Sequence, residues 1–434
     1  MKNAKYIVGI DLGTTNCVLA YTNAQVKEGD TTQIQIFEIP QLIATGELKA
    51  QPLLPSFLFL PGEHDVPAGS LALPWDSEAS IAVGEFARKR GPEIPNRLIS
   101  SSKSWLCNSG VDRTAAILPW DSPPETKKIS PVEASASLLK HLKEAWNHEM
   151  AGHDPETRLE DQELYLTVPA SFDAVARELT VKAAESAGLS NLTLLEEPQA
   201  AFYAWIESES LWRKIVKAGE SILVCDIGGG TTDFSLIQVT DEEGNLSLKR
   251  VAVGNHILLG GDNMDLALAY TAQAKLAQKG TKLDSWQFRA LTHSSRIAKE
   301  RLLSNTDIKK ESISILGRGS SLIKSSITTE LTREEVETVL LNGFLPICER
   351  SGRPEKKSKV VGIREIGLPY EADPAISRHL AYFLSLQSGS EDETSKVPYP
   401  STVLFNGGVM KSDLLRQRIL TVLNKWGNKR EEIK

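Results

Sequence analysis

The stretch from Ile222 to Val239, ILVCDIGGGTTDFSLIQV, constrains the fold more than any other part of the chain. Apolar runs on either side of a glycine-rich segment predict two buried strands joined in a hairpin. Because glycine has no Cβ, three in a row let backbone N–H groups curl around an anion, typically phosphate. The expected phosphate contacts in this loop are Gly228, Gly229, Gly230 and Thr231.

Two aspartates, Asp226 and Asp233, flank this loop. Carboxylates would repel a bare phosphate, so their presence predicts a hard cation at the site, most often Mg²⁺ held through water. The alternative is a glycine-rich turn with solvated aspartates, because short glycine motifs match by chance.

Residues 6–21, YIVGIDLGTTNCVLAY, repeat the same pattern. Asp11-Leu12-Gly13 corresponds to Asp226-Ile227-Gly228, again after an apolar strand and before a second one. One acidic Gly/Thr hairpin is an ordinary turn, whereas two predict two similar lobes that bind one polyphosphate.

The composition excludes several classes of protein. The 434 residues suggest two or three domains, and the net charge of −7 leaves no nucleic-acid footprint. No apolar run approaches the length of a membrane helix or a signal peptide. The four cysteines are far apart in the chain, which argues against a zinc site or disulfide framework and predicts a cytoplasmic protein.

Strands and helices alternate between residues 131 and 205, which predicts an α/β lobe. Helical spacing covers Pro131 to Met150, and a strand runs from Leu164 to Val168. Ser171 is the expected N-cap of a helix from Phe172 to Ala187, before a further strand and an alanine-rich helix. Elsewhere we expect a strand from Pro55 to Leu60, helices from Ser285 to Ser304 and from Ser412 to Trp426, and a helix with Thr332 as its N-cap.

Two more glycine pairs follow in the second half. Gly260 and Gly261 precede a helix, where N–H groups favour phosphate, although an ordinary loop into a capped helix is equally expected. Gly407 and Gly408 follow a buried strand and suit close approach by a ligand. Residues 351–399 are irregular, with a helical middle from Ile363 to Leu386, and are expected to be an insertion.

Six of these stretches, in this order, resemble the ATPase domain of the seventy-kilodalton heat-shock chaperones. They are VGIDLGTTNCVLA, LTVPASFDAVARELTVKAAESAGL, LEEPQAAFYAW, CDIGGGTTDFSL, LLGGDNMD and LFNGGVMKS. The resemblance covers most of the chain and implies an α/β, actin-like two-lobed ATPase fold with duplicated ribonuclease-H-like lobes. The expected division is lobe I at 1–205, lobe II at 206–400 with its insertion, and a closing strand and helix at 401–434.

The same resemblance implies a role for each matching residue. ATP or ADP would bind with Mg²⁺, with K⁺ as a further candidate cation. Lys103, Glu197 and Asp226 would be catalytic, with Lys103 on the γ-phosphate and the two carboxylates orienting the attacking water; a solvated helix charge is the alternative for Lys103. The implied metal ligands are Asp11, Asp226 and Asp233. The implied nucleotide contacts are Gly13, Thr14, Thr15, Asn16, Gly228 to Thr231, Gly260, Gly261, Lys299, Gly407 and Gly408. Pro169 and Arg177 match a relay that transmits the nucleotide state.

This chain departs from the family pattern in places. Arg296 stands where an acidic adenosine contact is usual, and Glu300, Val409 and Lys411 also differ, so the adenine contacts are less defined than the phosphate contacts. The insertion suggests a divergent subfamily. The family's closing segment and peptide-binding domain do not occur in the 434 residues, so we expect marginal stability, weak hydrolysis and no peptide binding by this chain alone.

The expected function is ATP binding and slow hydrolysis in a molecular chaperone. Its expected partners are co-chaperones and, through the missing region, unfolded polypeptide, but neither nucleic acid nor a membrane. The alternatives are a small-molecule kinase or phosphatase of the actin-like superfamily, an actin-like filament former, or a non-catalytic truncated homologue.

Overall fold

The computed structural model describes residues 4–25, 33–120, 122–152, 154–209, 212–242, 245–317, 326–355, 367–388, 399–427 and 433. The chain divides into two compact units. Unit 1 comprises Met1–Glu197 and Ile366–Pro369, and unit 2 comprises Pro198–Glu365 and Tyr370–Lys434. The division lies before the boundary expected after residue 205, and residues 401–434 are part of unit 2.

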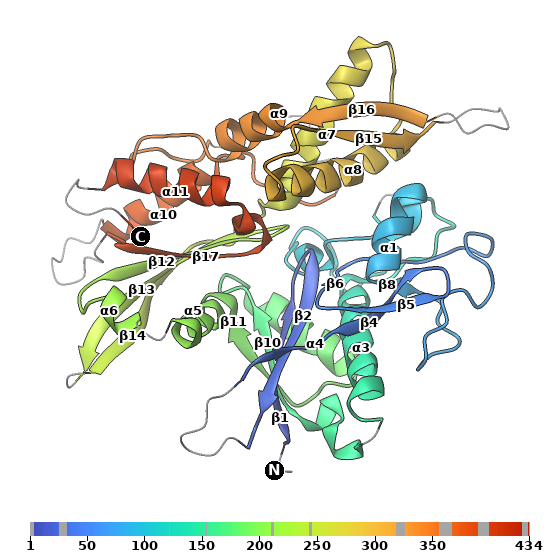
Figure 1. Cartoon of the computed structure of the whole chain (residues 1–434), viewed down its shortest axis with the longest axis horizontal. Coiled ribbons are helices and arrows are strands. Elements are labelled where there is room, and N and C mark those ends of the chain that lie inside the picture. The colour runs from blue at the N-terminus through green and yellow to red at the C-terminus, as the bar shows by residue number, and fades with distance from the viewer. Residues whose placement is uncertain are drawn as a thin grey trace. The chain divides into compact units, whose positions relative to one another are not determined.

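Unit 1 is built on a sheet with the strand order β11-β10-β1-β2-β3 (Figure 1). Strands β1 and β2 form the expected antiparallel hairpin, and β10 lies parallel beside β1. The strand bounds are β1 Tyr6–Leu12, β2 Asn16–Asn23, β3 Gln35–Ile36, β10 Glu163–Val168 and β11 Leu192–Glu196.

Two helices, α3 (Pro131–Glu149) and α4 (Ala174–Ser186), complete this layer of unit 1. Trp146 of α3 packs edge-on against the rings of Tyr6 and Tyr21, which anchors α3 to β1 and β2. The predicted N-cap of α4 was wrong: Asp173, not Ser171, accepts a 2.6 Å hydrogen bond from the Ala176 amide. A carboxylate is also favoured there by the helix dipole.

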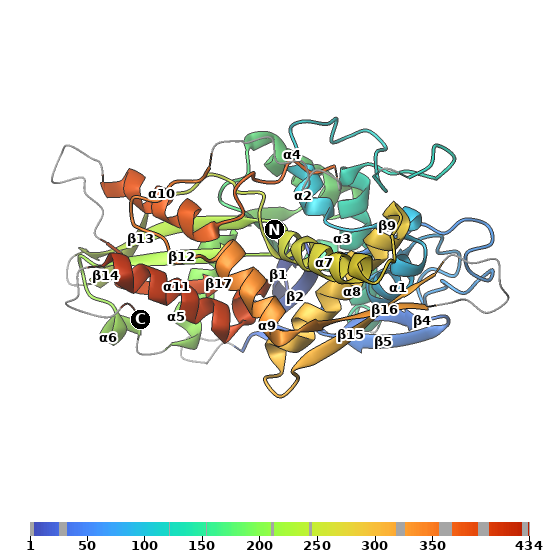
Figure 2. The same cartoon turned by 90° about the horizontal axis from the view of Figure 1, so that it is seen from above.

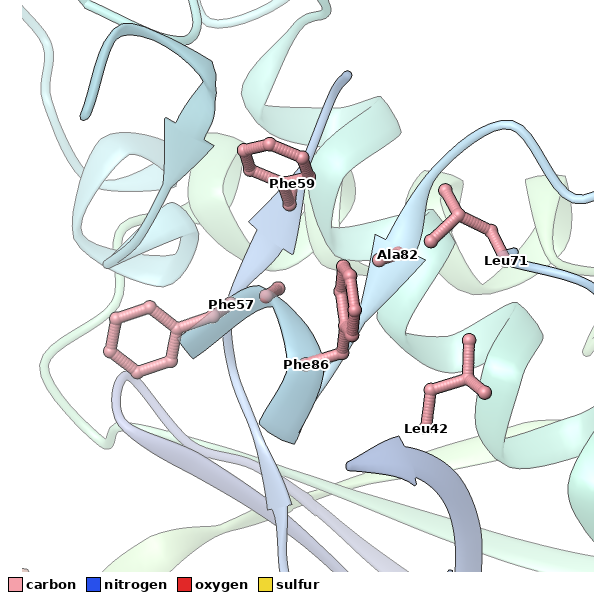
Figure 3. Close-up of a cluster of buried hydrophobic side chains, with 7 residues drawn as sticks. Leu42, Phe57, Phe59, Leu71, Ala82 and Phe86 are labelled. Carbon is pink, nitrogen blue, oxygen red and sulfur yellow. The ribbon is translucent and has the colours of Figure 1, made fainter. Parts of the chain in front are cut away.

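A further hydrophobic cluster of unit 1 lies among the short elements that follow the first hairpin. Figure 3 shows Phe86 projecting from α1 among Phe59, Leu42 and Leu71. The strand expected from Pro55 to Leu60 is two short strands, because β6 pairs with β2 while β7 pairs with β8 and β9. The elements are β4 Ile39–Ala44, β5 Glu47–Gln51, β6 Leu54–Pro55, β7 Leu58–Phe59, β8 Ala82–Val83, α1 Glu85–Arg90, β9 Leu98–Ile99 and α2 Ser102–Leu106.

Unit 2 is built on a second sheet, with the order β14-β13-β12-β17. One face packs on α5 and α6 through a cluster that includes Phe202, Trp212 and Val224. The opposite face carries α10 and α11 (Figures 1 and 2), and Phe234 stacks there on Phe383 of α10 with ring centroids 5.8 Å apart. The elements are α5 Glu197–Ser208, α6 Trp212–Ile215, β12 Ser221–Ile227, β13 Thr232–Glu242, β14 Asn245–Val253, α10 Ile376–Ser388, β17 Thr402–Asn406 and α11 Asp413–Trp426.

The rest of unit 2 is a helical layer with a short hairpin. It contains α7 Gly261–Gln278, α8 Ser285–Ser304, β15 Lys310–Leu316, β16 Ser326–Thr332, α9 Arg333–Thr338 and a π-helix at Val339–Phe344. Thr332 is the N-cap of α9, as predicted. Of the helix expected from Ile363 to Leu386, residues 363–366 lie outside the described residues, and the helix itself begins at Ile376. No helix in the described part of the chain combines the length and apolarity needed to cross a bilayer.

The fold of unit 1 contains a buried histidine that should make stability depend on pH. Burial lowers the pKa of His141 on α3 to about 4, against about 6.5 in an unfolded chain. Between these pH values the unfolded chain binds a proton that the folded chain does not. The contribution of neutral His141 to the free energy of unfolding is therefore full above pH 6.5 and is lost as pH falls toward 4. We expect wild-type unfolding free energy to fall by about 3 kcal/mol more than that of His141→Gln over this range.

Thermal or urea unfolding at pH 7, 6, 5 and 4.5 measures this difference. His148→Gln is the matched control, because His148 lies in the same helix with its side chain 42% exposed. Parallel pH curves for wild type and His141→Gln would contradict the assignment.

Candidate functional site

Each of the two sheets places an aspartate at the same point of a hairpin. Asp11 lies near the end of β1, opposite Thr167 on the parallel strand β10, and Thr167 Oγ1 donates a 2.9 Å hydrogen bond to Asp11 Oδ1. Asp226 lies near the end of β12, opposite Asn406 on the parallel strand β17, and Asn406 Nδ2 donates a 2.8 Å hydrogen bond to Asp226 Oδ2. The duplication seen in the sequence therefore extends to the polar partner of each aspartate.

The first loop, Gly13 to Asn16, is held from one side by Ser56. The Ser56 hydroxyl donates to the Gly13 carbonyl at 2.7 Å, and the Ser56 amide donates to the Thr15 carbonyl at 2.8 Å. A Cβ on Gly13 would lie 2.3 Å from the Asn16 carbonyl oxygen, so the turn requires glycine. These contacts fix the carbonyl groups of Gly13 and Thr15 within the loop.

Lys103 and Glu197 form a part-buried ion pair in unit 1, with side chains 10% and 14% exposed. Lys103 lies on α2, which begins after Ser101, a non-glycine residue with a φ of 55°. Such a backbone conformation is costly and concentrates at functional sites. Burial raises the pKa of the Cys17 thiol to about 12, and the Asp11 carboxylate and Lys103 ammonium also act on this thiol. Lys103 and Asp11 therefore both lie near the first loop.

The side chain of Glu196 faces Arg177 next to this pair. Arg177 Nη2 donates to Glu196 Oε1 at 2.9 Å and to the Ala170 carbonyl at 3.1 Å. Because Glu196 immediately precedes Glu197, this contact ties the segment after Pro169 to the carboxylate that pairs with Lys103.

The second loop, Gly228 to Thr231, is held by the first turn of α7. The Gly261 amide donates to the Gly228 carbonyl at 3.0 Å, and the Asp262 amide donates to the Gly229 carbonyl at 2.7 Å. A Cβ on Gly260 would lie 2.7 Å from both loop carbonyls, so this close approach requires glycine. The helix start expected to contact phosphate thus uses two of its amides to fix the loop.

Asp226 and Asp233 face each other across the hairpin as paired residues of β12 and β13. Both are about 95% buried, and His256 Nδ1 lies 3.5 Å from Asp233 Oδ1. Gly407 approaches Asp226 closely, since a Cβ there would lie 2.7 Å from Asp226 Oδ1. Two carboxylates, an amide and glycine backbone therefore meet at one end of the unit 2 sheet.

The described residues contain no group of three or more His, Cys, Asp and Glu side chains arranged to hold a metal ion by themselves. Oxygen donors are nevertheless what Mg²⁺ requires, and Mg²⁺ is usually bound by one or two carboxylates together with water and substrate phosphates. Asp226 and Asp233, which lie together in unit 2, supply oxygens of this kind, so these two residues fit such an ion. Asp11 supplies a carboxylate of the same kind in unit 1.

Basic residues of α8 contact the first turn of α7. Arg296 pairs with Asp262 and Asp265, and Lys299 Nζ lies 2.7 Å from Asp265 Oδ1. Burial by itself would lower the pKa of Arg296, but the two carboxylates outweigh it and raise that pKa above its usual value. Arg296, noted in the sequence as a departure, is therefore engaged within unit 2.

Within each unit the structure brings together the predicted residues it contains. Unit 1 groups Asp11, the first loop, Lys103 and Glu197; unit 2 groups Asp226, Asp233, the second loop, Gly260, Gly261, Lys299, Gly407 and Gly408. Sequence reasoning missed three supporting residues, Ser56, Thr167 and Asn406. Thr167 is the next-to-last residue of β10, two positions before Pro169, and Asn406 is the last residue of β17, directly before Gly407. A polar residue at the end of an apolar strand is the signal that could have found them.

Comparison with protein families matches residues 110–354 to the family described as Hsp70 protein. A chaperone protein HscA homolog from Bordetella pertussis is 30% identical over 75% of this chain and 45% of its own length. Chaperone protein DnaK from Thermotoga petrophila is 30% identical over 77% of this chain and 48% of its own length. An HscA homolog from Acidithiobacillus ferrooxidans is 29% identical over 83% and 51%. The chain thus spans about half the length of the curated relatives it matches.

The glycine pair after β17 allows a direct test of the local packing. Gly407 has a φ of 87°, and a Cβ there would lie 2.3 Å from the Ile227 carbonyl oxygen. We expect Gly407→Ala to lower the free energy of unfolding by about 1–3 kcal/mol, because backbone must shift and the φ is strained. Urea unfolding measures the change.

Gly408→Ala is the matched control, since a Cβ at Gly408 would meet nothing within 4 Å. We expect its effect to stay within about 0.5 kcal/mol. Equal losses for the two variants would show that the geometry at Gly407 is not what requires glycine.

Proposed function

The chain belongs to the Hsp70 family, with the α/β actin-like fold of that family's ATPase domain, and on this premise we propose that it binds ATP with Mg²⁺ and hydrolyses it slowly. Family membership implies an ATPase. We propose the slow rate of hydrolysis, the residues that contact the nucleotide, and the chaperone role.

The repeated pairing of an aspartate with a polar residue of the parallel strand is the observation that carries this proposal. Asp11 with Thr167 and Asp226 with Asn406 stand at the tips of two glycine hairpins. Each hairpin presents backbone N–H groups suited to phosphate beside a carboxylate suited to a hydrated cation. A structural turn would not require the same arrangement twice.

Phosphoryl transfer to water needs positioning and charge stabilisation more than covalent chemistry. The Lys103 ammonium would stabilise charge on the γ-phosphate, and Mg²⁺ would neutralise charge that develops on the phosphate oxygens. Glu197 holds Lys103 in place and, with Asp226, would orient the attacking water. Asp11 and Asp233 would hold water molecules of the cation, and the two loops would bind phosphate oxygens through their amides.

We further propose a chaperone role, with co-chaperones and unfolded polypeptide as partners of the whole protein. The relatives matched by the chain are named as chaperones. The free thiols of Cys17, Cys107, Cys225 and Cys348 suit a reducing cytosol. A kinase would need an acceptor pocket with its own catalytic carboxylate, and the sequence offers no motif for one. Stimulation of ATP loss by sugars or polyols would favour the kinase alternative.

We expect Asp226→Asn to weaken Mg²⁺-dependent nucleotide binding at least about tenfold, because it removes one buried charge that would face the cation. Titration calorimetry with ATP and ADP, with and without Mg²⁺, measures the effect. Asp241→Asn is the matched control, as Asp241 lies on β13 and is exposed. Absence of Mg²⁺-dependent nucleotide binding by the folded wild-type protein would refute the proposed function.

We expect Lys103→Ala and Glu197→Gln to slow turnover by about one to three powers of ten, with ATP affinity changed far less, because both residues would act in the transition state. Single-turnover hydrolysis and calorimetry measure the two quantities. The double variant should lose little more than either single variant, since the residues act as a pair.

Lys140→Ala is the control for Lys103→Ala, because Lys140 forms an exposed ion pair with Glu144 one turn along α3. Single-turnover rates within a factor of about two of wild type would remove Lys103 or Glu197 from the mechanism.

A further inference from the structure

The second loop depends on α7 for its shape. The amides of Gly261 and Asp262 point at the carbonyls of Gly228 and Gly229, at 3.0 and 2.7 Å. Engaging these two carbonyls orients both peptide units of the loop, and therefore also the N–H groups on their other sides. Any displacement of the first turn of α7 would consequently displace the N–H groups expected to bind phosphate.

The first turn of α7 depends in turn on α8. Arg296 contacts Asp262 and Asp265 together, through Nη2 and Nε. Lys299 Nζ lies 2.7 Å from Asp265 Oδ1 and donates to the Gly261 carbonyl at 3.3 Å. Asp262, Asp265 and Lys299 are buried, and the Arg296 side chain is 14% exposed. A fork-shaped guanidinium can hold two carboxylates in a fixed geometry.

We propose that Arg296 is a positioning residue for the second loop, acting through Asp262 and Asp265 on the amides that hold Gly228 and Gly229. This inference rests on the proposed function, in which the loop binds the phosphates of a nucleotide. In this role Arg296 affects the binding of phosphates indirectly, through α7 and the second loop, and does not contact the base or the ribose.

The charges of the cluster support the same role. Two acidic residues of α7 face two basic residues of α8, so the cluster carries no net charge beside the loop. Without Arg296 one carboxylate would remain uncompensated in a buried position, where it would repel a polyphosphate. Tyr370 also lies near the cluster, and burial and the Asp262 carboxylate raise the pKa of its hydroxyl, which therefore stays neutral.

The test compares ligands that share adenosine and differ in phosphates. We expect Arg296→Gln to weaken Mg²⁺-ADP and Mg²⁺-ATP binding roughly tenfold or more, with adenosine affinity changed less than about twofold. Calorimetry follows the nucleotides and ligand-observed NMR follows adenosine. Arg296→Lys, which keeps the charge but cannot bridge both carboxylates in the same way, should recover part of the loss.

Hydrogen exchange in the nucleotide-free protein gives a readout that requires no ligand. The amides of Gly261 and Asp262 should exchange faster in Arg296→Gln than in wild type, because the first turn of α7, which carries these amides, is held less firmly. Arg301→Gln is the matched control, since Arg301 lies on α8 but forms an ion pair with Glu311 and is 62% exposed. Thermal unfolding of each variant confirms that it is folded.

Equal losses of adenosine and ADP affinity would overturn the proposal, because they would place Arg296 on the nucleoside. Unchanged ADP affinity with unchanged exchange at Gly261 and Asp262 would overturn it as well. If the wild-type protein binds no nucleotide, the proposed function fails, while the exchange comparison still decides whether Arg296 positions the first turn of α7.

Discussion

Parallel pairing of strands that are distant in sequence is the constraint on which the candidate residues of each unit depend. β10 places Thr167 beside Asp11, and β17 places Asn406 beside Asp226. The hairpin alone does not supply this polar partner, because Thr167 and Asn406 belong to the parallel strand beside it and not to the hairpin. Hydrophobic packing holds α5 and α6 on the sheet of unit 2, and Trp146 packs against Tyr6 of β1 in unit 1.

Buried charges form a second layer of control. A buried ion pair seldom adds much stability, because desolvation offsets most of the attraction, but loss of one partner is costly. Lys103 with Glu197 and Arg296 with its two aspartates are pairs of this kind. Their value lies in geometry, since each holds a side chain or a helix end where it can serve a loop built from glycine.

Several features of the fold followed from local patterns. Both hairpins, the strand at β10 and the helices α3, α8 and α11 lie close to their predicted positions, because apolar periodicity over many residues is a strong signal. The N-cap of α4 and the division between β6 and β7 were mispredicted. Asp173 competes with Ser171 for one amide, and Leu54–Pro55 pairs with β2 while Leu58–Phe59 joins another sheet; neither choice is visible in a single segment.

The sequence by itself determined the family, the α/β class, the duplicated acidic glycine loops and the residue types needed for a polyphosphate and a cation. The catalytic roles of Lys103, Glu197 and Asp226 stay predictions. Only the tertiary structure decided which residues support the loops. Ser56, directly after β6, binds the first loop from a strand that pairs with β2. Asn406 reaches Asp226 across 180 positions of chain, and α7 gives its first amides to the second loop. Its place at a strand end could have singled out Asn406, but the partners in these contacts leave no local signature. Backbone amides and small polar side chains occur in every segment and acquire a partner only when packing brings distant strands and helices together.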